Sequence, residues 1–140
     1  MTNPTRADLI RLGLDATLSG DLRRLREKVH LSRNAQAQLM DVTPDALKRW
    51  ENAEQGMNSQ SALRVGEWYW AAQNVLNTLG EDAVDLDQLV PLSTASQHLA
   101  MSAEEVEEKC RTGDLRCEHL GVLGTYVYRS YIPSLGPLED

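Results

Sequence analysis

The chain has 140 residues, which is room for one ordinary domain or two small ones. Hydrophobic residues make up 41% of it and charged residues 25%, a composition typical of a folded, soluble protein rather than a disordered one. No apolar run approaches the roughly 20 residues of a membrane crossing, and the first residues lack the apolar core of a signal peptide. We therefore expect a cytoplasmic protein without membrane contact, whose Cys110 and Cys117 stay reduced.

The formal net charge of −7 is unevenly distributed along the chain. Residues 1–80 carry ten Lys/Arg and nine Asp/Glu, whereas residues 81–140 carry four Lys/Arg and twelve Asp/Glu. Because phosphate backbones attract basic surfaces and repel acidic ones, any nucleic-acid surface is expected in the first half.

Apolar residues spaced three and four apart predict two short helices near the N-terminus, separated by a break at Ser19 and Gly20. The second of these helices, around Leu22 to Val29, has one apolar face. Its other faces carry positive charge from Arg23, Arg24, Arg26 and Lys28.

Two hydroxyl residues then stand at positions suited to helix N-caps. Ser32 is expected to begin a helix that ends at Met40, and Thr43 another from Pro44 to Asn52. Pro44 supports the second assignment, because its fixed φ suits the first helical position. The sequence therefore predicts two short helices joined by a tight turn at Asp41 and Val42, a helix-turn-helix layout.

The longest periodic stretch runs from Ser61 to Leu79, with Gly80 as its expected end. The acidic residues 81–87 that follow are the expected connector. We therefore predict two modules, residues 1–80 and residues 88–140.

The second module is expected to begin with helices from Ser93 to Ala100 and from Ser102 to Arg111, the latter ending at Gly113. Ser102 and Glu105 have the spacing of a capping box. Beyond them, β-branched and aromatic residues among glycines from Leu115 to Tyr128 predict a short β-hairpin, and Pro133 and Pro137 discourage further regular structure. The expected fold is mainly α, with a small C-terminal module that carries a hairpin.

Between Leu31 and Asn52, the telling residues are Ala37, Val42, Leu47 and the tail Arg49-Trp50-Glu51-Asn52. With them the segment resembles the helix-turn-helix of the Cro/repressor (Xre-type) family, and the resemblance extends over about residues 20–76. Gln36 stands where that family usually has an aliphatic residue, and Asp41 where it usually has a turn glycine.

A second set of telling residues lies between Val90 and about Leu135: Ala95, Leu99, Met101, Ser102, Val106, Gly113, Leu115, Leu120, Gly121 and Tyr128. With them this part of the chain resembles the winged helix-turn-helix of the excisionase and MerR families. It departs from those families in the second helix, where Glu104, Glu105, Glu107 and Glu108 replace basic or hydroxyl residues.

The first resemblance implies that the helix after Thr43 enters the major groove of double-stranded DNA, with Leu47 and Trp50 facing the core. Arg33 and Asn34, at the start of the preceding helix, are expected to meet a phosphate. Thr43 and Asn52, at the two ends of the recognition helix, complete the expected DNA-binding set. The groove-facing candidates between them are Pro44, Asp45, Ala46, Lys48 and Arg49.

The second module has several interpretations. Its four glutamates would repel phosphates, which favours dimerisation, docking of another protein or limited auxiliary contact over groove binding, although Arg116 or Arg129 of the hairpin could touch a backbone. His98, Cys110, Cys117 and His119 are potential zinc ligands with spacings unlike those of familiar fingers, and Cys110 is more simply a small core residue.

No catalytic motif is recognised, so we expect neither an enzyme nor a cofactor. Trp68, Tyr69 and Trp70 are interpreted as packing or dimer-interface residues rather than a base-stacking platform. The resulting expectation is a phage-type or bacterial transcriptional repressor that binds DNA as a homodimer or with both modules on one site. The alternatives are an antirepressor or adaptor whose acidic half binds a protein, and a phage excision factor.

Overall fold

A computed structural model of the chain describes residues 3–52, 56–81 and 84–133. These residues form seven α-helices and one three-stranded antiparallel sheet, which confirms the expected mainly α fold with a small C-terminal β module. The chain divides into two compact units, Met1–Leu76 and Asn77–Asp140. The division falls inside the fifth helix, before the acidic connector, of which residues 82 and 83 lie outside the described residues. No helix in the described ranges is long and apolar enough to cross a bilayer.

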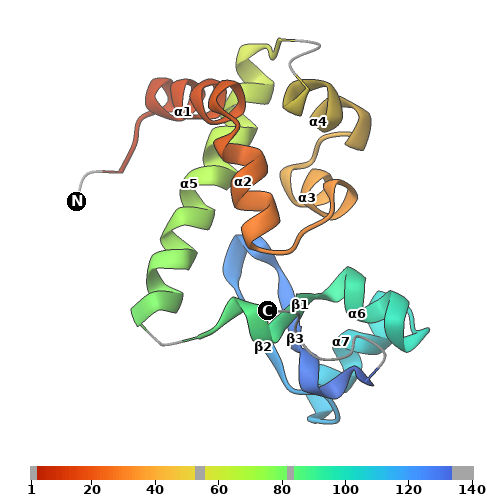
Figure 1. Cartoon of the computed structure of the whole chain (residues 1–140). Helices are drawn as coiled ribbons and strands as arrows, with labels where there is room; N and C mark the ends of the chain where they lie inside the picture. The colour runs from red at the N-terminus through yellow and green to blue at the C-terminus, as the bar shows by residue number, and fades with distance from the viewer. Residues whose placement is uncertain (1–2, 53–55, 82–83, 134–140) are drawn as a thin grey trace. The chain divides into compact units, whose positions relative to one another are not determined.

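The first unit consists of helices (Figure 1). Thr5 begins the first helix with a capping box to Asp8. Gly20 ends that helix at φ 82°, a left-handed conformation that glycine adopts without strain, and the next helix begins directly after it. The helices are α1 (Arg6–Ser19), α2 (Asp21–Lys28), α3 (Arg33–Met40), α4 (Pro44–Glu51) and α5 (Ser59–Glu81), the last of which continues into the second unit.

The turn between α3 and α4 has the predicted caps. Ser32 accepts a hydrogen bond from the backbone N–H of Ala35 and Thr43 one from that of Ala46, each at 3.1 Å. Asp41, the C-cap of α3, adopts the left-handed conformation at φ 57°. Its carbonyl accepts a hydrogen bond from Arg64 of α5 at 2.9 Å, which attaches the turn to the long helix.

Helices α1 and α5 pack with their backbones in direct contact, because each carries a glycine where they cross. A Cβ on Gly13 would lie 2.0 Å from the carbonyl oxygen of Ala62, and one on Gly66 would lie 1.8 Å from that of Leu9. Only glycine fits at these two positions. The apolar core of the unit includes Ala16, Leu22, Leu25, Val29, Leu31, Ala37, Met40, Leu47, Trp50, Ala62, Val65, Trp68 and Ala72.

Helix α5 is longer than the sequence predicted. It begins at Ser59 and runs through Gly80 to Glu81, so the expectation that Gly80 ends it is wrong. A Cβ at Gly80 would meet nothing within 4 Å, so neither backbone geometry nor packing requires glycine there. Of the three aromatic residues on this helix, Trp68 is buried, Tyr69 is half-buried and Trp70 is 38% exposed.

The second unit combines two short helices with a sheet in the order β1-β3-β2, in which β3 is antiparallel to both neighbours. Strands β2 and β3 form the predicted hairpin, and the capping box of Ser102 with Glu105 is present. The elements are the 3₁₀ turn η1 (Leu86–Gln88), β1 (Leu89–Pro91), α6 (Leu92–Leu99), α7 (Ala103–Thr112), β2 (Cys117–His119), η2 (Gly121–Leu123), β3 (Thr125–Tyr128) and η3 (Arg129–Tyr131).

Strand β1 has no counterpart in the sequence prediction. Its three residues are buried and pair with β3, with Val90 opposite Val127. The strand is short, and Pro91 serves at once as its last residue and as the N-cap of α6. A segment of three residues is too short to show the alternation of apolar and polar residues that indicates a strand. The core cluster of this unit consists of Val90, Ala95, Val106, Leu115, Val127 and Ile132.

Cys110 and Cys117 form a disulfide bond, so the expectation of two reduced thiols is wrong for this structure. Cys110 lies in the last turn of α7 and Cys117 is the first residue of β2. The chain reverses at Gly113, a left-handed residue, and brings the two Cα atoms to 5.7 Å, within the range that a disulfide spans. A separation of seven residues in the sequence does not reveal this reversal.

Candidate nucleic-acid interface

Helix α4 has two faces of opposite character. Leu47 is fully buried and Trp50 is 6% exposed, as the helical spacing predicted. Asp45, Lys48, Arg49 and Asn52 are all exposed and follow one another at intervals of three, one and three residues, which places them on one stripe. Within the first unit, α4 therefore presents a polar stripe above a buried apolar one.

The remaining predicted residues of α4 flank this stripe. Pro44 is exposed and Ala46 is half-buried at the start of the helix. The Thr43 hydroxyl accepts a hydrogen bond from the Ala46 N–H, so its first role is to begin the helix. The structure thus brings seven of the nine predicted site residues together on α4 and its two caps.

Beneath the C-terminal end of α4 lies a cluster of three charged side chains that the sequence analysis missed. Glu51 is almost fully buried and accepts hydrogen bonds from two arginines. Arg26 of α2 donates from Nε at 2.9 Å and from Nη2 at 3.1 Å. Arg33 of α3 donates from Nε at 2.8 Å. These bonds join α2, α3 and α4 at one carboxylate.

The environment of Glu51 favours its charged form. Burial by itself raises the pKa of the Glu51 carboxyl, but the hydrogen bonds and charges of Arg26 and Arg33 outweigh that effect and hold the pKa below its ordinary value. Arg26 also donates to the Leu31 carbonyl at 3.2 Å. At neutral pH the Glu51 carboxylate is therefore charged and accepts the hydrogen bonds of both arginines.

Arg33 has a structural contact in addition to the phosphate contact expected of it. Its Nε is bonded to Glu51, while 34% of its side chain stays exposed. Asn34, the next residue, is exposed in the first turn of α3. An open cavity of about 510 Å³ lies beside them and is lined by Arg23, Arg26, Glu27, Ser32, Arg33 and Asn34. The start of α3 and three arginines therefore share one surface depression.

Helix α7 of the second unit carries four exposed glutamates, at positions 104, 105, 107 and 108. Glu108 is paired with Arg111, and His119 Nδ1 lies 3.1 Å from Thr125 Oγ1 in the hairpin. Between α7 and the hairpin lies a cavity of about 580 Å³, here called the acidic groove, lined by Glu104, Glu107, Glu108, Arg111, His119 and Thr125.

The basic residues of the hairpin region are also engaged within the second unit. Arg116 lies over the Tyr128 ring, with its guanidinium carbon 4.4 Å from the ring centre. Tyr128 donates its hydroxyl to Glu118 at 2.7 Å, which raises the pKa of Tyr128. Arg129 is half-buried in η3. Within the described ranges, no three His, Cys, Asp or Glu side chains are grouped to hold a metal ion.

No protein-family model, curated protein or solved structure matches this chain.

Proposed function

We propose that the chain is a sequence-specific DNA-binding transcriptional regulator of the repressor type, which acts in the cytoplasm and inserts α4 into the major groove. The observation that carries this proposal is the stripe of Asp45, Lys48, Arg49 and Asn52, exposed above the buried Leu47 and Trp50. A helix joined by a tight, capped turn to a second helix is the usual means of presenting such a stripe to base edges.

The side chains of the stripe have complementary chemistry for base edges. Lys48 and Arg49 donate to guanine or to phosphate oxygens, Asn52 can pair with adenine, and Asp45 can accept from the amino group of cytosine. Pro44, Ala46 and Thr43 offer methyl and methylene surface to thymine methyl groups, and Thr43 adds a hydroxyl. The variety of these groups favours sequence readout over purely electrostatic binding.

The depression at the start of α3 suits a phosphate of the same DNA. Arg33 and Asn34, in the first turn of α3, both line this depression, and 34% of the Arg33 side chain is exposed. The positive end of a helix with such residues is suited to a phosphate. The Glu51 bond to Nε of Arg33 restricts the guanidinium group to one side of the helix. Glu51 is buried and acts through Arg33, so we assign it the role of a positioning residue.

One module of this size makes few base contacts, so we expect two to bind together. Either a homodimer places two α4 helices on half-sites about one helical turn apart, or both units of one chain share a site. Binding over a promoter would block polymerase.

The test compares DNA binding by two double variants that remove equal charge. The operator is first located by footprinting DNA that flanks the gene. Lys48→Ala with Arg49→Ala is expected to weaken operator binding at least about tenfold at constant salt. Arg6→Ala with Arg11→Ala removes the same charge from exposed positions on α1 and is expected to change affinity less than about threefold. Equal affinities for the wild type and the α4 variant would refute the proposal.

The acidic groove favours a second candidate function, that of an antirepressor or adaptor whose second unit binds a basic protein. An excision factor is a further alternative within the DNA-binding class, since the second module resembles excisionases. Salt dependence separates the classes: a steep fall of binding with salt together with a discrete footprint supports the regulator. A stable protein complex without a footprint supports the adaptor.

A further inference from the structure

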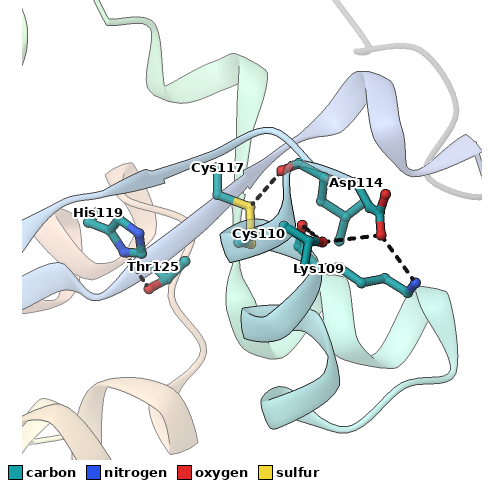
Figure 2. The surroundings of a disulfide bond; sticks show 8 residues. Lys109, Cys110, Asp114, Cys117, His119 and Thr125 are labelled. Carbon is teal, nitrogen blue, oxygen red and sulfur yellow. Dashed lines mark hydrogen bonds and ion pairs between the residues drawn. A yellow bond between two sulfur atoms is a disulfide. The ribbon is translucent and has the colours of Figure 1, made fainter.

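The disulfide of the second unit joins α7 to β2 (Figure 2). These are two of the three elements that line the acidic groove, the third being β3. Cys110 and Cys117 are the only cysteines of the chain. Both side chains are partly buried and pack against the hydrophobic core of the unit. The bond therefore attaches the C-terminal end of α7 to β2, which is an edge strand of the sheet.

Non-covalent contacts hold the connection between α7 and β2 in place independently of the bond. The Leu115 N–H donates to the Lys109 carbonyl at 3.1 Å, and the Leu115 side chain is buried. Lys109 and Asp114 form an ion pair at 3.8 Å, and Gly113 takes the left-handed conformation that closes the helix. None of these contacts involves a sulfur atom, so they do not depend on the bond and can bring the same pair together again after it is broken.

The bond closes only a short loop. A disulfide stabilises a fold mainly by restricting the unfolded chain, and that effect grows with the number of residues enclosed. Because the two cysteines are only seven residues apart, the bond restricts the unfolded chain little and adds little stability in this way. The bond is thus better suited to adjusting the local stability of a folded unit than to maintaining the fold.

We propose that Cys110 and Cys117 form a reversible thiol–disulfide pair whose state sets how firmly α7 is attached to β2, and thereby how rigid the acidic groove is. A small-molecule disulfide such as glutathione disulfide is the oxidant. One cysteine thiolate attacks it, forms a mixed disulfide and expels one glutathione thiolate; the second cysteine thiolate then displaces the other. The two cysteine protons end on two glutathione molecules, and the reverse reaction regenerates both thiols.

The first experiment equilibrates the full chain in glutathione buffers of graded oxidised-to-reduced ratio, followed by thiol trapping and mass measurement. We expect the protein to change from mostly reduced to mostly oxidised across the ratios found between cytoplasm-like and secretory-compartment-like conditions. A disulfide that persists in the most reducing of these buffers would mean a permanent structural bond. Free thiols in the most oxidising one would mean no pair at all. Either result overturns the proposal.

The second experiment measures amide hydrogen exchange in both states. Reduction is expected to speed exchange in α7 and β2 by about tenfold, because opening of this segment becomes easier. Helices α3 and α4 of the first unit serve as the internal reference and are expected to be unaffected. Equal exchange of α7 in the two states would overturn the regulatory part of the proposal.

Two variants of the chain serve as matched controls for the wild type. Cys110→Ser with Cys117→Ser is expected to show the fast exchange in every buffer. Thr112→Ala alters the same loop but keeps both cysteines, and is expected to respond to the buffer as the wild type does. A variant with both cysteines replaced that still responded to glutathione would also refute the proposal.

Discussion

Arg26 and Glu51, 25 residues apart in the sequence, form a two-point ion pair in which Nε and Nη2 of the arginine each donate to a different carboxylate oxygen. Only 11% of the Arg26 side chain and 1% of the Glu51 side chain are exposed. A charge pair this well enclosed ties α2 to the end of α4, and the loss of one partner leaves the other without compensation.

We expect Glu51→Gln to lower the free energy of unfolding by about 3 kcal/mol, because Arg26 keeps its buried position and loses its charge partner. Urea unfolding followed by tryptophan fluorescence measures this, since Trp50, Trp68 and Trp70 all lie in the first unit. Glu67→Gln, at an exposed position of α5, is the control and is expected to change the free energy by less than about 0.5 kcal/mol. Similar losses in both variants would contradict the assignment.

The same carboxylate predicts a specific dependence of stability on pH. Glu51 has a pKa below its ordinary value of 4.5 in the folded protein. It therefore contributes stability above the pKa of the unfolded chain, and this contribution is lost as the pH falls through the folded pKa. The stability difference between wild type and Glu51→Gln should be constant from pH 7 to about 5.5 and shrink below about 4.5. A difference that persists undiminished at about pH 3 would show that Glu51 is not the titrating group.

Sequence reasoning succeeded where the signal is local. The caps at Ser32 and Thr43 and the capping box of Ser102 each depend on residues within one helical turn, so the helices that they begin are found close to the predicted bounds. The burial of Leu47 and Trp50 follows from helical spacing in the same way. The expected hairpin of the second unit is present for the same reason, because its β-branched and aromatic residues are contiguous.

The features that were missed depend on chain segments meeting across a distance. Nothing near Glu51 in the sequence indicates that Arg26 and Arg33 converge on it. Strand β1 exists because β3 is available to pair with it, and the disulfide exists because the chain reverses after α7. These contacts are properties of the tertiary fold. The sequence therefore predicted the exposed residues of α4 but neither the bonds of Glu51 to Arg26 and Arg33 nor the Cys110–Cys117 disulfide.

The crossing of α1 and α5 is expected to be intolerant of a single methyl group. Gly13→Ala and Gly66→Ala each place a carbon against a backbone carbonyl of the other helix, and a backbone cannot move aside as a side chain can. We expect each to cost about 2 kcal/mol or more of unfolding free energy, although alanine is the better helix former by about 1 kcal/mol. Gly80→Ala, in open space on α5, is the control and should be neutral or stabilising. Thermal unfolding followed by circular dichroism compares the three, and an unaffected Gly13→Ala would refute the close approach.

Gln36 is a position where, unlike Gly13 and Gly66, a substitution is expected to stabilise the folded protein. Its side chain is fully buried, Nε2 lies 3.9 Å from the Met40 sulfur, and Oε1 has no hydrogen-bond partner. A buried amide oxygen without a partner costs free energy that an apolar side chain of similar volume does not. We therefore expect Gln36→Met to raise the free energy of unfolding by about 1 kcal/mol in urea denaturation. Gln38→Met, exposed on the same helix, controls for helix propensity and should gain nothing. A loss of stability in Gln36→Met would mean that the amide has a partner, such as an internal water, that compensates its burial.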